Sequence, residues 1–157
     1  MVSFQYRSPL RPLKGAIADA QAMKAFFTSK LSVQDRHIRT LFGPEATHDN
    51  ILDSFRTHLI SNPDIRDGDP IVFYFAGHGT RCDAPDEWTT VDKKCEAICP
   101  WDVSQTEEGN NTVYPIMDRT LWALLHGLAQ EKGNNITVIL DCCHSGSGSR
   151  VSHYSYR

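Results

Sequence analysis

The sequence predicts an α/β fold in which a mostly parallel sheet carries helices on both faces. Two runs of β-forming residues, "IVFYF" at 71–75 and "ITVIL" at 136–140, are each long enough for one strand. Such continuous apolar runs are typical of strands that are buried on both faces of a parallel sheet. Helical patterns lie before and between the two runs, and strands that alternate with helices form parallel sheets.

Three stretches with apolar residues at three- and four-residue spacings predict the helices. They are residues 16–31, 47–61 and 117–135. Thr47 is expected to be the N-cap of the second helix and Asp118 that of the third, because their side-chain oxygens can accept from the first free backbone N–H groups. Gly133 is expected to end the third helix.

The remaining segments are shorter or more polar. Brief alternation at 37–43 and a small apolar group at 95–102 each predict a short strand. Residues 80–94, "TRCDAPDEWTTVDKK", are mostly polar and predict a loop.

Composition limits the classes of function. The chain has 157 residues, enough for one domain with a hydrophobic core. Its formal net charge is -3 and no basic cluster occurs, so we expect no nucleic acid and no membrane as partner. No apolar run could span a bilayer and no signal peptide is evident, which predicts a cytoplasmic location. Five cysteines, an odd number, argue against a disulfide framework in a reducing compartment.

Reactive groups follow both apolar strands. "IVFYF" leads into Ala76-Gly77-His78-Gly79, and "ITVIL" leads into Asp141-Cys142-Cys143. Functional groups collect at the carboxyl ends of strands in open α/β sheets, so neighbouring strands would bring His78 and one cysteine to the same edge. A thiol beside an imidazole is a nucleophile with its base. The Gly79 N–H and the cysteine N–H could hold the developing oxyanion.

The pattern alone does not choose between the two thiols, because successive side chains of an extended segment point to opposite faces. "FYFAGHG" and "DCCHSG", in which Cys143 comes 65 residues after His78, resemble the caspase–metacaspase group of cysteine peptidases, especially its fungal metacaspase-like branch. The resemblance implies that Cys143 is the nucleophile and His78 the general acid/base, with Gly79 and Cys143 supplying the oxyanion N–H groups. Cys142 would then be a small neighbour that packs inward.

A second segment, "PLKGAIADA", resembles the part of this family that lines the pocket for the residue before the scissile bond. The matching positions are Ala16 and Asp19, and Asp141 is the other acidic wall. Ala76 stands near the same pocket, where several family members have serine. Two carboxylates in one pocket favour a cationic side chain, so the resemblance implies cleavage of a polypeptide after Arg or Lys.

The resemblance runs from about residue 8 to residue 148 and implies a caspase-like three-layer sandwich around a mostly parallel sheet. The family's first apolar strand and its C-terminal small-subunit region are largely absent from these 157 residues. Residues 1–157 are therefore expected to form a single, partial domain of the large-subunit (p20) type. A partner chain or the small-subunit region would complete the sheet, whose edge would otherwise be exposed.

Other interpretations stay open. The chain could be a catalytically inactive caspase-like fragment or interaction domain that a partner completes. It could also be a redox or metal-binding protein, with zinc held by Cys82, Cys95, Cys99 and His144, although a second paired-cysteine motif is missing. His144 could act as a second base.

No cofactor is expected to be required, and a calcium dependence would follow from the resemblance alone. No spacing of aspartates after His78 resembles an EF-hand loop, so none of them is assigned as a ligand. The aspartates in this stretch are Asp83, Asp86, Asp92 and Asp102. The sequence does not tell whether the protein takes part in cell death, the usual association of the family.

Overall fold

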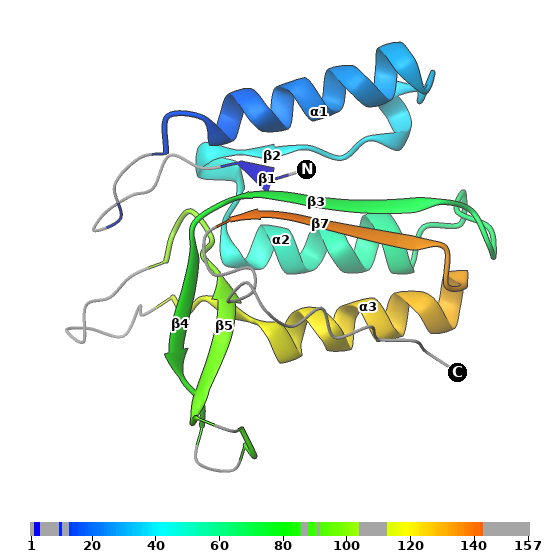
Figure 1. The fold of residues 1–157 in the computed structure, drawn as a ribbon. Helices are drawn as coiled ribbons and strands as arrows, with labels where there is room; N and C mark the ends of the chain where they lie inside the picture. Colours follow the sequence, from blue (N-terminus) through cyan, green and yellow to red (C-terminus); the bar gives the residue numbers. More distant parts are fainter. Residues whose placement is uncertain are drawn as a thin grey trace.

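A computed structural model describes residues 2–3, 10, 13–85, 88–90, 92–103 and 113–142 (Figure 1). Its helices are α1 (Ala16–Lys30), α2 (His48–Ser54) and α3 (Asp118–Lys132), with short helical segments η1 (Asp35–His37), η2 (Gly43–Glu45) and η3 (Phe55–Ile60). Its strands are β1 (Val2–Ser3), β2 (Leu41–Phe42), β3 (Ile71–Gly77), β4 (Gly79–Asp83), β5 (Lys94–Ile98), β6 (Ile116–Met117) and β7 (Ile136–Cys142).

Four parallel strands form the main sheet, in the order β2-β1-β3-β7. β3 and β7 pair along their whole length, from Ile71 opposite Ile136 to Gly77 opposite Cys142. β1 is much shorter and pairs with β3 only at Phe75 and Ala76. The predicted parallel α/β sheet is confirmed, and its two apolar strands are direct neighbours.

Helices cover both faces of this sheet, as Figure 1 shows: α1 lies on one face, and α2 and α3 lie on the other. Alternate side chains of β3 divide between the two faces. Phe73 and Phe75 belong to the main core with Phe55, on the side of α2 and α3. Tyr74 and Ala76 pack in a smaller cluster that includes the start of α1. Burial of each large apolar side chain stabilises the fold by about 2 kcal/mol.

The antiparallel sheet β4-β5-β6 lies beyond the end of β3. The loop predicted for residues 80–94 is therefore partly wrong, because residues 79–83 form strand β4. Arg81 and Asp83 are exposed, whereas Thr80 and Cys82 are half-buried. The strand alternates polar and half-buried positions, which a search for apolar runs overlooks.

β7 is more exposed than its apolar sequence predicts. Val138 keeps 37% of its surface accessible, and Thr137 is also exposed. The physical reason is position, because β7 is the outermost strand of the sheet within the described ranges. The prediction of burial on both faces is wrong for 136–140, and for 71–75 it holds except at Val72, which is 38% exposed.

The helix ends follow the predictions with one correction. The Thr47 side chain accepts a hydrogen bond from the Asn50 N–H at 3.2 Å, as expected of an N-cap. Gly133 ends α3 with φ of 80°, a conformation that favours glycine. Asp118 is not the N-cap, because α3 already begins at this residue and Met117 precedes it. Over the described ranges, no helix combines the length and apolarity that crossing a membrane requires.

Candidate active site

The two strands that carry the predicted reactive residues end side by side. Ala76 lies opposite Asp141 and Gly77 opposite Cys142, and His78 follows directly after β3. The structure thus confirms that the two strands are neighbours and that their carboxyl ends meet at one edge. Cys143 is the next residue after β7 and lies outside the described residues.

His78 is half-buried at the junction of the two sheets, between the last residue of β3 and the first of β4. Its carbonyl accepts a hydrogen bond from the Cys99 N–H at 2.9 Å. This bond joins the end of β3 to the end of β5. The backbone at His78 is therefore held by both sheets, which is how a rigid scaffold positions a reactive side chain.

Gly79, the predicted oxyanion donor, begins β4 and lies opposite Ile98 of β5. Hydrogen-bonded and non-hydrogen-bonded pairs alternate along an antiparallel ladder. Because the neighbouring pair, His78 and Cys99, is hydrogen-bonded, the Gly79 N–H points away from β5. Its role toward an oxyanion stays a prediction.

The Tyr74 hydroxyl is affected by both carboxylates that were predicted to share a pocket. Its hydroxyl donates to Asp141 Oδ2 at 3.1 Å. Burial above all, together with the hydrogen bond and charge of Asp141 and the charge of Asp19, raises the pKa of Tyr74 to about 12. Asp19 and Asp141 therefore act on the same hydroxyl, although they come from α1 and from β7.

The start of α1 brings Asp19 to this place. The Asp19 N–H bonds to the Gly15 carbonyl at 2.9 Å, and the Asp19 carboxylate folds back over Gly15. A β-carbon at Gly15 would lie 3.1 Å from Asp19 Oδ2, so a side chain there would press on this carboxylate. Ala16 and Ala76 pack in one buried cluster with Tyr74. Both alanines are nearly inaccessible, and their small size lets α1 approach β3 closely.

Sequence reasoning did not single out Tyr74. A signal for it existed, because side chains two apart in a strand share a face. Tyr74 and Ala76 therefore point to the same side of β3, and Asp141 is the β7 residue paired with Ala76. A parallel register between the two apolar strands would have brought Tyr74 next to Asp141.

Cys142 packs against the main core, together with Leu140 of the same strand. The expectation that this thiol is an inward-packed neighbour is confirmed. The next cysteine and His144 lie beyond the described residues, so the suggestion of a second base at His144 stays a prediction.

The three cysteines of the proposed zinc site do not converge, and His144 lies outside the described residues. Cys82 and Cys95 face each other with their Sγ atoms 3.2 Å apart. Cys99 lies four residues farther along than Cys95, about 13 Å away at 3.3 Å per strand residue. Zinc binds thiolates at about 2.3 Å, so one ion cannot bind all three. In the described part of the chain no group of three or more His, Cys, Asp or Glu residues is placed to hold a metal ion.

Three of the four aspartates that follow His78 have other partners. Asp83 pairs with Lys94 across the β4–β5 hairpin, and Asp92 pairs with Arg81. Asp102 accepts the His48 backbone N–H at 2.8 Å, near the start of α2. Asp86 lies outside the described residues. These three carboxylates are thus engaged separately, and the calcium dependence implied by the resemblance stays a prediction.

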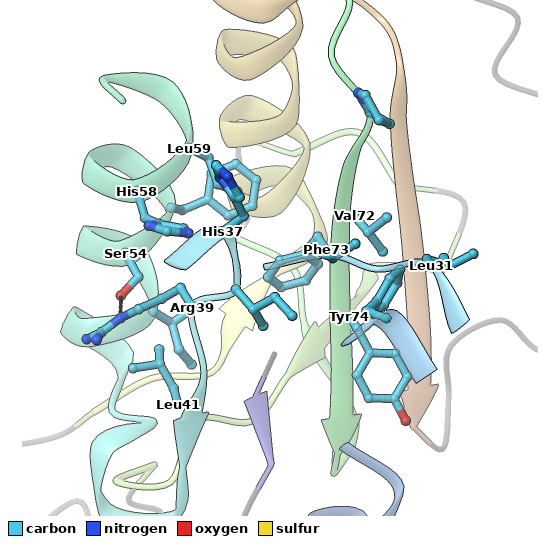
Figure 2. Close-up of a pocket in the computed structure, with 16 residues that line it drawn as sticks. Leu31, His37, Arg39, Leu41, Ser54, His58, Leu59, Val72, Phe73 and Tyr74 are labelled. Carbon is cyan, nitrogen blue, oxygen red and sulfur yellow. Dashed lines mark hydrogen bonds between the residues drawn. The ribbon is translucent and has the colours of Figure 1, made fainter. Parts of the chain in front are cut away.

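A cavity of about 440 Å³ lies elsewhere, beside the first half of β3 (Figure 2). Its walls come from the end of α1, from residues 37–41, from α2 and η3, and from Val72, Phe73 and Tyr74. This part of β3 has no pairing with β1. The lining is mainly apolar, and its polar members are His37, Arg39, Ser54 and His58. The cavity thus lies toward the opposite end of β3 from His78.

Residues 1–151 match the family model described as metacaspase, peptidase C14 domain. Metacaspase-9 of Arabidopsis thaliana is 30% identical over 151 residues, which cover 93% of this chain and 42% of that protein. Metacaspase-2 of Trypanosoma brucei brucei is 31% identical over 103 residues, which cover 66% of this chain and 26% of that protein.

A crystal structure shares the fold. Protein GSU0716 from Geobacter sulfurreducens superposes with a TM-score of 0.64 at 21% identity, over 93% of this chain and 50% of that one. At this identity the likeness concerns the fold alone. The chain spans only 42% and 26% of the two curated relatives compared above.

Proposed function

Because this chain belongs to the metacaspase family, peptidase C14, we propose that it carries the nucleophile and base of a cysteine endopeptidase. Cys143 is the nucleophile and His78 is the general acid/base. The observation that supports the assignment is the register of the two strands, in which Gly77 lies opposite Cys142. His78 and Cys143 follow these two paired positions in the sequence, so both come after the carboxyl ends of neighbouring strands.

The proposed reaction is acyl transfer to a thiol. The His78 imidazole takes the proton of Cys143, and the thiolate attacks the carbonyl carbon of the scissile peptide bond. The N–H groups of Gly79 and Cys143 stabilise the oxyanion of the tetrahedral intermediate. His78 then gives its proton to the leaving amine, and a thioester forms on Cys143. Water, deprotonated by His78, cleaves the thioester and restores the thiol.

We further infer that the enzyme cleaves after Arg or Lys. This specificity is supported by the charges of Asp19 and Asp141, which both act on the Tyr74 hydroxyl, because a guanidinium group pairs well with such carboxylates. The bond from the Tyr74 hydroxyl holds one oxygen of Asp141. Tyr74 is therefore a positioning residue, which acts on the substrate through Asp141.

The test is hydrolysis of fluorogenic peptides that carry Arg, Lys or Asp before the scissile bond. Wild type, Cys143→Ala and Cys142→Ala are compared, with and without calcium, and circular dichroism checks that each is folded. We expect cleavage after Arg or Lys that is lost in Cys143→Ala and retained in Cys142→Ala. A folded wild-type chain without activity would instead favour an inactive domain that needs a partner chain.

A further inference from the structure

The β4–β5 hairpin holds a pair of cysteines that the proposed peptidase chemistry does not use. Cys82 of β4 lies directly opposite Cys95 of β5. Their Sγ atoms are 3.2 Å apart, closer than either thiol lies to the backbone carbonyls near it. Both side chains project from the same face of the hairpin, because directly opposed residues in a sheet do so.

The backbone at this position has the spacing that a disulfide requires. The Ala84 N–H donates to the Lys93 carbonyl at 2.9 Å, which makes this a hydrogen-bonded pair. Two residues farther into the ladder, Cys82 and Cys95 form the next such pair, for which the Cα atoms are about 5.5 Å apart. Disulfides are commonest at Cα separations of about 5.5–6 Å. The strands need not move apart or slide for the bond to form.

Neighbouring charges hold the register of the hairpin. Lys94 pairs with Asp83 across the two strands, and Arg81 pairs with Asp92. These groups alternate with the cysteines along the strands, so they occupy the other, exposed face. The two thiols are therefore held opposite each other by contacts that do not involve sulfur.

We propose that Cys82 and Cys95 form a reversible modification site, a cross-strand disulfide that is made by exchange with a low-molecular-weight disulfide such as oxidised glutathione. The product fixes the hairpin that begins at Gly79, directly after His78. A single reversible bond of this kind differs from a structural disulfide framework, which the odd cysteine count argues against.

The exchange takes place in two balanced steps. The half-buried Cys82, as thiolate, attacks one sulfur of the small disulfide, and the first small thiol leaves. Cys95 Sγ then attacks Cys82 Sγ, and the departing second thiolate takes up the Cys95 proton. The two protein thiols lose two electrons and two protons, and the small disulfide gains them as two thiols.

The environment of the two thiols favours this order. Cys95 is buried and Cys82 is partly accessible, so a small disulfide reaches Cys82 first. In the reduced pair, burial above all, together with the hydrogen bond and charge of Cys82, raises the pKa of Cys95 to about 12. The second step therefore needs a proton acceptor, and ring closure is expected to quicken as pH rises.

The experiment uses the full 157-residue chain in glutathione buffers of graded ratio, quenched with an alkylating reagent. Digestion after Glu96 separates Cys95 from Cys99, so mass spectrometry can identify the linked pair. We expect a Cys82–Cys95 link that is two hydrogen atoms lighter than the reduced pair. At a fixed ratio of oxidised to reduced glutathione, about tenfold dilution should raise the linked-to-reduced ratio about tenfold, because the exchange releases two thiols.

Controls distinguish this site from general oxidation. Cys82→Ser should abolish the link, whereas Cys99→Ser, a change at a buried cysteine just beyond the same strand, should leave it unchanged. The linked wild type should melt about 5 °C above the reduced form, and linkage should not shift melting of Cys82→Ser. The chain unfolded in urea should show no preference for this pair.

Three results would overturn the proposal. One is a mixed glutathione adduct on Cys82 that does not change with dilution, and another is separate alkylation of both thiols in every buffer. The third is a link between Cys142 and Cys143 that forms more readily than the hairpin link. None of these readouts needs peptidase activity, so failure of the proposed function would leave the result interpretable.

Discussion

The two ends of β3 differ in character, although only a few residues separate them. At the carboxyl end, Tyr74 bonds to Asp141, and His78 follows. At the amino end, Phe73 packs its ring against Phe55, with centroids 5.5 Å apart, beside the apolar cavity. The cavity lies toward the amino end, whereas the Tyr74–Asp141 hydrogen bond and His78 lie toward the carboxyl end. The difference teaches that a cavity alone does not mark a candidate site, and that the chemistry of the surrounding residues must be weighed with it.

The largest expected effect lies at the amino end and concerns stability. Phe73→Ala removes a ring that is 93% buried and enlarges the cavity, so the free energy of unfolding should fall by about 3 kcal/mol. Urea unfolding measures this loss. Val72→Ala, at an exposed neighbour, should cost less than about 1 kcal/mol. Similar losses for both variants would contradict the assignment of the core to this side of β3.

The next effect lies at the carboxyl end and concerns activity. Asp141→Asn removes one charge of the acidic pair, so kcat/KM for Arg substrates should fall about 100-fold, equivalent to about 2.7 kcal/mol. Fluorogenic assays measure it, and urea unfolding should show a much smaller change. Asp64→Asn serves as the control, because Asp64 is an exposed carboxylate far from Asp141 in the sequence. Unchanged Arg cleavage in a folded Asp141→Asn protein would remove Asp141 from the specificity pocket.

A strained turn at the amino end of β7 should respond more weakly. An added β-carbon at Gly133 would lie 2.7 Å from Asp67 Oδ1 and 3.1 Å from the Gly68 nitrogen. Gly133→Ala should therefore lower the free energy of unfolding by about 2 kcal/mol. Gly68→Ala is a matched control, because φ there is also positive, at 83°, but the added carbon meets no atom within 4 Å. The difference between the two variants measures the close contact alone.

Tyr74 lines the cavity and also bonds to Asp141. It should make the free energy of unfolding depend on pH in the alkaline range. Its pKa is raised to about 12, above the usual value of 10.0, so the unfolded chain loses this proton first. Its contribution to stability is thus fully present below pH 10 and is lost as pH rises toward 12. Tyr74→Phe should cost about 1 kcal/mol at neutral pH and flatten this alkaline slope. An unchanged slope in the urea midpoints would contradict the role of the Asp141 bond.

His58 in the cavity wall should give the smallest effect, in the opposite pH direction. Burial lowers the pKa of His58, and the nearby Arg39 guanidinium lowers it further. The unfolded chain then binds the proton more readily, so stability is present above pH 6.5 and falls as pH drops below it. In His58→Gln this acidic slope should become shallower, as urea midpoints at several pH values would reveal. An identical slope would show that other groups dominate.

Much of the fold was predictable because it depends on local patterns. The helix starting after Thr47, the end of α3 at Gly133 and the parallel pairing of the two apolar strands all follow from residue types and spacing. The exposure of Val138 did not follow, because an apolar run does not tell whether a strand is central or outermost. Strand β4 was missed for a related reason, since its residues become strand-like only when paired with β5.

The candidate site also contains residues whose placement the sequence predicts and residues whose placement it does not. His78 follows β3 and Asp141 lies near the end of β7, so their placement at the same end of the sheet is a consequence of the strand register. Tyr74 and the Cys82–Cys95 pair depend on which residues lie opposite each other in space, and sequence spacing alone does not contain that information. The short distance between the two thiols results from the pairing of β4 with β5, which the sequence did not predict.

The long separation between β3 and β7 has a consequence for synthesis on the ribosome. Gly77 pairs with Cys142, which comes 65 residues later in the chain. At about 5–20 residues per second, this interval lasts about 3–13 s. During that time the edge of β3 that pairs with β7 has no partner. The aromatic rings of Phe73 and Phe75 are also present without that neighbouring strand. The nascent chain is therefore expected to need capture by a chaperone until β7 has emerged.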